Sequence, residues 1–339
     1  MAAGGAERVF WLLSQGFNKD DYEVSIVILN IQNAFFPLEL DNVRIVDLNT
    51  KRTSLSFPKL YKLIKKERPY AVFGTGDEIN FLISSVSLFV KIPFIIARPT
   101  SISTEMLQFS SIKGKVLNRF TSIFYKNFNV IVCQSLEIKN ALLKTFKVNP
   151  DKMVVIPNPV LISDFLKAEL SMKRLIIVGR LTGVKGHDRL LQMFSELPDE
   201  YTLTCAGDGE LKETLISNAG TLNVLQRVNF LGRVSNPIEI ISQHDVLVLT
   251  SYSEGFPNVI LESLSVGVPV VTFRVGGVSN FVVDDYNGYI VEQDDLEGFK
   301  KSIIKACARK WNSEDIKNNI RARFSLEKIS SMYEDLIEA

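Results

Sequence analysis

The stretch RLIIVGRLTGVKGHDRLLQMFSELPDEYTLTCAGDG, residues 174–209, carries the pattern that decides the fold. An apolar run, RLIIV, ends in a glycine-rich loop, an amphipathic segment follows, and YTLTCA makes a second apolar run. Short Val- and Ile-rich runs that alternate with helical segments are typical of βαβ units, whose neighbouring strands are parallel. Residues 174–209 are therefore predicted to form a strand, a loop, a helix and a second strand.

The same alternation continues in both directions along the chain. Toward the C-terminus it runs through VNFLGR, VLVLTS, NVILESLSVG and PVVTFR to a helix predicted over residues 296–308. Before the proline-rich IPNPV it runs through YEVSIVILN, VRIVDLN, YAVFGTG, PFIIAR and VIVCQS. Two such series in 339 residues predict an α/β protein with two Rossmann-like domains that face each other across a cleft. The predicted domains are residues 1–163 and 164–322, and residues 323–339 are expected to form a helix, for which packing back on the first domain is one arrangement.

The composition excludes several classes of protein. Apolar residues make up 46% and charged residues 23%, which is an ordinary globular mixture. A net charge of +1 is too balanced for a surface that grips nucleic acid all round. The three cysteines are far apart and no apolar run reaches the roughly 18 residues that span a bilayer. Because the N-terminus also lacks a signal-peptide pattern, a cytoplasmic location is expected.

The loop after RLIIV places two cations at a strand exit. In GRLTGVKG, residues 179–186, Arg180 and Lys185 stand five residues apart among three glycines, beginning with Gly179. Ligands of such sheets bind at the carboxyl ends of the strands, and two cations with a closely approaching backbone suit a phosphate or diphosphate. Solvated loop charges are the alternative interpretation of this motif taken alone.

The loop after VLVLT reads SEGFPNVILE, residues 253–262. Pro257 suits a first helical turn, which would direct free N–H groups at an anion. Glu254 would then lie in the loop and Glu262 inside the helix, where a carboxylate beside an anion is stable if it accepts hydrogen bonds from neutral donors such as sugar hydroxyls. An ordinary exposed helix residue is the alternative for Glu262.

Three further glycine pairs are candidates with weaker signals. Gly276-Gly277 and Gly207-Asp208-Gly209 follow strands, and Gly4-Gly5 precedes the helical pattern ERVFWLL. Each also fits a simple turn. No acidic pair has a His or Cys cluster beside it, so no metal site is predicted.

In order and spacing, the motifs GRLTGVKG, AGDGELK, NFLGRVSN, SYSEGFPNVILES and the GG of RVGGVSN resemble the retaining GT-B glycosyltransferases of family 4, of the bacterial surface-polysaccharide type. Glu254 and Glu262 match that family's Glu-x7-Glu signature, and GGAERV and VVIPNPV extend the resemblance over nearly the whole chain. It implies transfer of a hexosyl or N-acetylhexosaminyl group from a nucleotide-sugar, most often a UDP-sugar, to a saccharide or lipid-linked saccharide in capsule or O-antigen synthesis, with retention and no metal or other cofactor. The implied donor domain is residues 164–322, and the implied acceptor-side domain is residues 1–163.

The resemblance also implies roles for individual residues. Arg180, Lys185 and Glu254 would be the catalytic residues: the two cations would neutralise the diphosphate, and Glu254 would bind hydroxyls of the donor sugar. Glu262 would bind the ribose diol, and Arg233 with Val234 would lie against the base. The other implied donor-binding residues are Gly4, Gly5, Gly179, Gly255, Phe256, Pro257, Asn258 and Val259.

The sequence departs from the family pattern in the first domain. The two histidines, His187 and His244, both lie in the second half, whereas many members carry a His near the reacting sugar in the first domain. Arg98, after PFIIA, stands in a comparable loop and is assigned with Asp77 to the acceptor side, although a structural salt bridge would equally explain Arg98. A second departure is Asn280, where related chains often have Glu.

Four other functions compete with this interpretation. A dehydrogenase is disfavoured because the G-x-G motifs lack a third glycine, and an exported sugar-binding protein because the sequence shows no signal peptide. A GT-B-shaped nucleotide-sugar epimerase and an inactive sugar-nucleotide-binding protein stay open.

Two expectations concern the first half of the chain. Residues 1–165 carry 20 Lys and Arg against 14 Asp and Glu, with basic segments at residues 60–68 and 112–126, which predicts peripheral binding to an anionic membrane surface; a solvated helix face is the alternative. In a Rossmann-like domain a central strand precedes the first glycine turn, and Gly4 leaves no room for one. YEVSIVILN and YAVFG are therefore expected to flank an unfilled position, which about 10 to 15 upstream residues would close.

Overall fold

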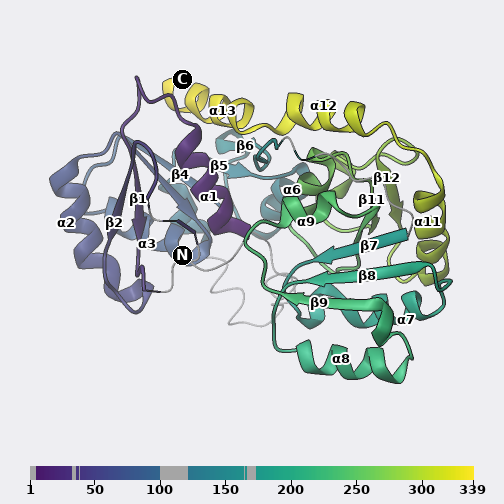
Figure 1. Cartoon of the computed structure of the whole chain (residues 1–339). Helices are drawn as coiled ribbons and strands as arrows, with labels where there is room; N and C mark the ends of the chain where they lie inside the picture. Colours follow the sequence, from purple (N-terminus) through teal and green to yellow (C-terminus); the bar gives the residue numbers. More distant parts are fainter. Residues whose placement is uncertain (1–4, 33–35, 38, 100–120, 164, 166–172) are drawn as a thin grey trace. The chain divides into compact units, whose positions relative to one another are not determined.

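The computed structural model describes residues 5–32, 36–37, 39–99, 121–163, 165 and 173–339. The chain forms two compact units (Figure 1). The first comprises Met1–Pro159 together with Leu326–Ala339, and the second is Val160–Ser325. Among the described residues, no helix combines the length and apolarity needed to cross a bilayer.

The second unit is built on one parallel sheet of six strands. Its order is β12-β11-β10-β7-β8-β9, so that β7 lies inside the sheet between β8 and β10. The strands are β7 (Lys173–Val178), β8 (Tyr201–Ala206), β9 (Val228–Gly232), β10 (Val246–Leu249), β11 (Val270–Phe273) and β12 (Gly288–Val291). This is the Rossmann order 3-2-1-4-5-6, with β7 as its first strand.

Helices cover both faces of this sheet. The elements are α7 (His187–Ser195), α8 (Lys212–Thr221), α9 (Pro237–Ser242), α10 (Asn258–Ser265), α11 (Leu296–Ala308) and α12 (Ser313–Phe324), with short 3-10 turns η3 (Gly183–Lys185), η4 (Leu225–Arg227) and η5 (Val278–Asn280). Leu175 and Ile177 of β7 pack in the core with α7, α8 and α11, whereas Ile176 packs with α9, α10 and α12. Because both faces are buried, the strand is an uninterrupted apolar run.

The first unit contains two separate parallel sheets. One is β1 (Val24–Ile28) with β2 (Val43–Asp47), and the other has the order β3-β4-β5-β6. The other strands are β3 (Ala71–Thr75), β4 (Phe94–Arg98), β5 (Val130–Cys133) and β6 (Met153–Val155). In the described residues, β1 pairs only with β2, and β3 pairs only with β4. YEVSIVILN and YAVFG thus each keep one unpaired edge, as the sequence predicts; the prediction about upstream residues stays a prediction.

The helices of the first unit form a layer on each face of these sheets. They are α1 (Gly5–Gly16), α2 (Phe57–Glu67), α3 (Asp77–Ser87), α6 (Leu136–Thr145) and α13 (Leu326–Glu338), with η1 (Thr53–Ser56) and η2 (Pro150–Lys152) between them. Helices α2, α3 and α6 share one apolar core, and α1 shares another with α13. The last helix of the chain therefore packs within the first unit.

The two ends of the second unit lie side by side. Val160 forms a parallel bridge with Ser325, and its N–H donates to the carbonyl of Phe324. Residues 160–325 therefore leave and rejoin the rest of the chain at adjacent points.

Candidate functional site

The loops that follow β7 and β10 are tied together at one edge of the sheet. Their strands are parallel neighbours, so both chains leave the sheet at its carboxyl edge. The hydroxyl of Thr250 donates to the carbonyls of Lys185 at 3.2 Å and Gly186 at 2.9 Å, and the Tyr252 N–H donates to the carbonyl of Val184. The two motifs with the strongest sequence signals therefore form one surface.

Lys185 and Glu254 face each other across these loops. Lys185 Nζ lies 2.6 Å from Glu254 Oε1, and the same oxygen accepts a hydrogen bond of 2.6 Å from Ser251 Oγ. The side chains are 23% and 13% exposed, so the pair is shielded but reachable by solvent. Sequence reasoning assigned these residues to different parts of a donor and did not predict that they pair.

Arg180 lies beside this pair in sequence but is not part of it. It is an exposed residue, and within the described part of the chain its guanidinium has no hydrogen-bond or ion-pair partner. Its carbonyl accepts from the Thr182 N–H, which holds the backbone of the loop. The exit of β7 thus offers one free cation and one cation shared with a carboxylate.

Arg189, which sequence reasoning missed, holds the Glu254 loop from below. This residue of α7 is 4% exposed and donates to the carbonyls of Thr250 and Ser251. Its guanidinium carbon also lies 3.8 Å from the ring centroid of Tyr252 and 4.1 Å from that of Phe273. An Arg on the buried side of an amphipathic helix was the available signal, but its partners lie about 60 residues away in sequence.

Helix α10 begins directly after the Glu254 loop. Its N-cap is Pro257, one residue earlier than the first-turn position that the sequence predicts, and no side chain caps it. The N–H groups of the first turn are therefore not taken up by a capping side chain, which leaves an anion-binding end. Gly255, Phe256, Asn258 and Val259 are half-buried, and the Phe256 ring contacts Phe281 with centroids 5.2 Å apart.

Glu262 is buried rather than exposed. It lies within α10, as predicted, and only 6% of its surface is accessible. The interpretation of Glu262 as an ordinary exposed helix residue is therefore wrong. A buried carboxylate needs hydrogen-bond partners, and Glu262 does interact with neighbouring groups.

Two glycines let the loops approach one another. Gly186 has φ +64°, and a Cβ there would collide with the carbonyl oxygen of Thr250. A Cβ on Gly276 would lie 2.5 Å from the carbonyl oxygen of Glu254. The pair Gly276-Gly277 thus contributes close packing behind Glu254, and Asn280, in the following turn, donates to the carbonyl of Gly277.

The remaining predicted donor residues occupy neighbouring strand exits. Gly179 ends β7 and is half-buried, and Arg233 with Val234 follows β9. Arg233 is exposed, whereas Val234 packs against the core of α9 and α10. These positions lie at the carboxyl edge that carries Lys185 and Glu254, two strands away for β9.

Both histidines are structural in this unit. His244 is buried and bonds to the carbonyl of Ile240 and the hydroxyl of Thr204. His187 begins α7, is almost fully buried, and has no hydrogen-bond partner for either ring nitrogen among the described residues. Burial, with a smaller contribution from the Lys185 charge, lowers the pKa of His187 to about 4.

The predicted acceptor-side residues belong to the first unit. Arg98 ends β4 instead of lying in a loop, is 2% exposed, donates to Asn158 Oδ1, and stacks over Phe10. Its partner is an amide, so a carboxylate salt bridge is not what holds it. Asp77 begins α3 and accepts a 3.2 Å hydrogen bond from Tyr125; crowding by surrounding atoms raises the pKa of its carboxyl although the residue is exposed overall. Gly5 begins α1, and Gly4 lies outside the described residues.

No group of three His, Cys, Asp or Glu side chains in the described ranges is arranged to hold a metal ion. A cavity of about 1820 Å³ lies in the first unit, away from the Lys185–Glu254 pair. The arrangement in the second unit is an anion site with a carboxylate beside it.

Comparison with known proteins gives this site a context. The family model of glycosyl transferases group 1 matches residues 163–323, and that of Glycosyltransferase Family 4 matches residues 3–163. The UDP-Gal:alpha-D-GlcNAc-diphosphoundecaprenol alpha-1,3-galactosyltransferase of Escherichia coli is 26% identical over 83% of this chain and 79% of its own length. An alpha-1,4-N-acetyl-D-galactosaminyltransferase of Campylobacter jejuni, named for a diNAcBac-PP-undecaprenol-linked saccharide, is 24% identical over 99% of this chain and 94% of its own.

Solved structures agree with this fold. The Anabaena protein HepE in complex with UDP and glucose superposes with a TM-score of 0.81, at 16% identity, over 99% of this chain and 96% of its own. A sucrose-phosphate synthase of Thermosynechococcus elongatus gives 0.85, at 17% identity, over 99% and 93%. Two glycosyltransferase models thus match nearly the whole chain in complementary halves, and the chain belongs to the family 4 type glycosyltransferases with the GT-B fold.

Proposed function

We propose that this protein is a retaining glycosyltransferase that moves a hexosyl or N-acetylhexosaminyl group from a UDP-sugar to a lipid-linked saccharide, in the synthesis of a cell-surface polysaccharide such as capsule or O-antigen. The observation that carries the proposal is the Lys185–Glu254 pair beside the free Arg180 at neighbouring strand exits. Two relatives that are named for diphosphoundecaprenol- or PP-undecaprenol-linked saccharides support the acceptor class. Solved structures with UDP support the donor class.

The charges suit a departing diphosphate. Lys185 has three N–H donors and uses one on Glu254, so two are left for phosphate oxygens. Arg180 can add a forked contact, and the N-terminus of α10 can add backbone N–H groups from residues 256–259. Preorganised donors at the position where negative charge develops stabilise the transition state more than they stabilise the substrate.

Glu254 is positioned to hold the donor sugar. Its Oε1 accepts from Lys185 and Ser251, and among the described residues Oε2 has no printed partner. In this proposal Oε2 accepts from sugar hydroxyls, Glu262 binds the ribose diol, and Arg233 with Val234 lies against the base. The leaving diphosphate takes the proton of the acceptor hydroxyl, so the chemistry needs no metal ion.

The test is transfer by Arg180→Ala and Lys185→Ala variants, measured as product formed from UDP-sugars and a polyprenyl-diphosphate-linked N-acetylglucosamine. Each variant is expected to lose about 100-fold or more in kcat, the scale for losing one preorganised charge partner. Lys301→Ala, an exposed cation on α11, is the matched control and should retain full activity. Near-native transfer by both site variants would reject the assignment.

Two further readouts separate the alternatives. The coupling constant of the anomeric proton in the product should report the donor's configuration. An epimerase would interconvert the sugar nucleotide without acceptor, and an inactive binding protein would bind UDP without turnover.

We also propose that the first unit rests on the cytoplasmic face of an anionic membrane, where a lipid-linked acceptor is found. In α2, Lys62, Lys65 and Lys66 are exposed while Leu60 and Ile64 face the core. Phe89, 68% exposed, follows α3 and contacts Phe57 at the start of α2, which places an apolar side chain near this basic helix. Most of the second basic segment, at residues 112–120, lies outside the described residues.

Flotation with anionic vesicles tests this attachment. The chain is expected to float at low salt and less so at high salt, and Lys62→Glu with Lys65→Glu should weaken binding by about tenfold, since each cation near such a surface contributes about 1 kcal/mol. Lys301→Glu, in the second unit, is the charge-matched control. Failure to float at low salt would refute the proposal without affecting the test of transfer.

A further inference from the structure

The cavity of the first unit lies between two strand edges. It is lined by every residue from Val24 to Leu29 and by Ala71, Val72, Phe73 and Thr75. Successive residues of a strand point to opposite faces, so a cavity above a face would be lined by alternate residues. Lining by consecutive residues of β1 and of β3 means that the cavity borders their edges, which are the edges that pair with no described strand.

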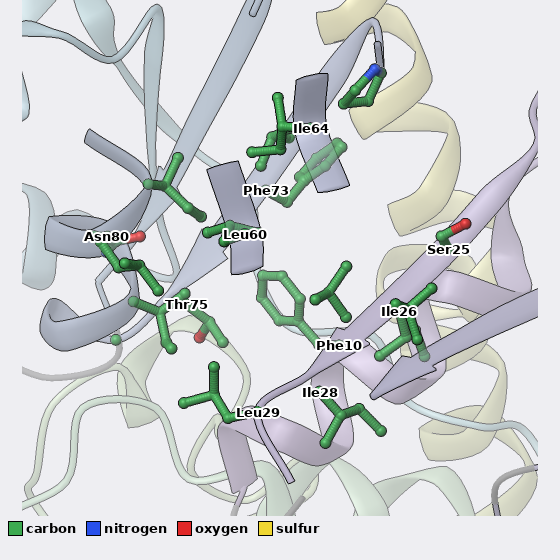
Figure 2. A pocket seen from close by; sticks show the side chains of 18 of the residues that line it. Phe10, Ser25, Ile26, Ile28, Leu29, Leu60, Ile64, Phe73, Thr75 and Asn80 are labelled. Atoms are coloured by element: carbon green, nitrogen blue, oxygen red, sulfur yellow. The ribbon is translucent and has the colours of Figure 1, made fainter. Parts of the chain in front are cut away.

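Helices close this cavity on both faces of the sheets. One wall is a face of α1, including Ala6, Phe10 and Leu13, and the opposite wall includes Leu60 and Ile64 of α2 with residues of α3 (Figure 2). Helices α1 and α2 belong to the cores on opposite faces of the sheets. The cavity therefore lies in the layer that strands occupy.

The second unit shows what such a layer contains. There β7, between β8 and β10, pairs in parallel with both and is followed along the chain by α7 and β8. In the first unit, the sequence α1, β1, β2, β3, β4 repeats the sequence α7, β8, β9, β10, β11. The cavity between β1 and β3 corresponds to the position of β7.

Helix α1 has the packing of a crossover helix. It contacts both β1 and β3, which border the cavity on its two sides. In a right-handed βαβ unit, the helix that joins two parallel neighbours packs across them. Thus α1 is placed to connect a strand in the cavity to β1.

Polar groups in the cavity wall have no partner in the described part of the chain. Thr75 Oγ1 and both amide atoms of Asn80 are buried without a hydrogen bond, and Asn80 is 3% exposed. Figure 2 shows both side chains at this wall. Buried polar groups normally have partners, which a polypeptide in the cavity could supply and an acyl chain could not.

We propose that this cavity is a strand-binding slot that accepts an extended apolar polypeptide segment, parallel to β1 and β3 and leading into α1. Five or six residues match the five-residue length of β1 and β3. Both faces of the segment would meet helices, so it is apolar throughout, as β7 is. Once bound, it pairs with both edges and joins the two sheets into one with the order of the second unit.

The experiment adds about 12 residues before Met1: six apolar, β-branched residues and a polar link. The matched control has the same length but carries two prolines in the apolar part, since proline cannot donate to a ladder. The extended chain is expected to melt about 5 °C or more above the unextended one, and the control to melt near it. Backbone amides of β1 and β3 should exchange hydrogen about tenfold more slowly only in the extended chain, while those of β8 stay unchanged.

A separate peptide guards against an extension that impairs folding. The same six residues, flanked by lysines for solubility, should protect β1 and β3 when added to the unextended chain. Equal melting temperatures for the two extended chains, with no change in exchange at β1 and β3, would overturn the proposal. Protection by dodecanoate but by neither polypeptide would identify an acyl-chain cavity instead and would also overturn it.

Discussion

At the scale of single residues, the Glu254 loop depends on a side chain that never touches the expected donor. Arg189 is buried beneath the loop and satisfies the carbonyls of Thr250 and Ser251 while two aromatic rings enclose its guanidinium. It is a positioning residue, because it acts on Glu254 through the backbone. The flat, forked geometry of Arg is what this arrangement requires, and Lys cannot reproduce it.

Arg189→Lys should therefore lower both stability and transfer. Leaving buried carbonyls with poorer partners is expected to cost about 2 kcal/mol in the free energy of unfolding, and displacement of Glu254 about tenfold in kcat. Urea unfolding and steady-state kinetics measure these effects, and KM for the acceptor should not change. Arg274→Lys is the control, because the Arg274–Glu292 pair is exposed and worth little. Equal behaviour of the two variants would contradict a positioning role for Arg189.

His187 makes stability depend on pH. Its pKa is about 4 in the folded protein because of burial, against about 6.5 when unfolded. The unfolded chain therefore binds a proton below about pH 6.5 that the folded chain refuses, and stability falls as the pH decreases from there toward 4. Between about pH 7 and about pH 5 the loss from this group should approach 2 kcal/mol.

Comparison with His187→Leu isolates this contribution. Urea unfolding at both pH values should show a smaller decrease for the variant, while His244 contributes equally to both proteins. Identical pH dependence in the two proteins would mean that His187 is not neutral in the fold.

At the scale of elements, most strands and helices follow from sequence periodicity. The helix predicted over residues 296–308 is α11, and the proline of the second loop correctly separates Glu254 in the loop from Glu262 in the helix. Contacts between elements were less accessible. The Lys185–Glu254 pair depends on β10 lying beside β7, and Arg98 was placed in a loop because the end of a buried strand carries no local signal.

The last helix is an element whose role sequence reasoning left open. Ile329 of α13 is fully buried in the core that it shares with Val9 and Leu13 of α1 and with β4 and β5. Ile329→Ala should lower the free energy of unfolding by about 3 kcal/mol, because it removes buried methyl groups and leaves a cavity. Asp335→Ala, on the exposed side of the same helix, should change it by less than about 0.5 kcal/mol. A small effect of Ile329→Ala in urea unfolding would show that α13 is dispensable for the first unit.

At the scale of the whole molecule, donor binding can be followed without an acceptor. A nucleotide-sugar at about 100 times its Kd should stabilise the protein by about 2.7 kcal/mol. Thermal melting is expected to shift with UDP-sugars more than with GDP- or ADP-sugars, and Lys185→Ala should reduce the shift. Excess chelator should leave both the shift and transfer intact, and strict dependence of transfer on Mg²⁺ would contradict the metal-free chemistry.

The bridge between Val160 and Ser325 has a consequence for inheritance. A segment whose two ends lie together can be exchanged at two junctions without disturbing the fold that receives it. Residues 160–325 meet that condition. Recombination at these two points would move the whole segment between related genes as a cassette, and a chimaera built in this way is the natural starting point for engineering enzymes that combine one partner's donor with another's acceptor.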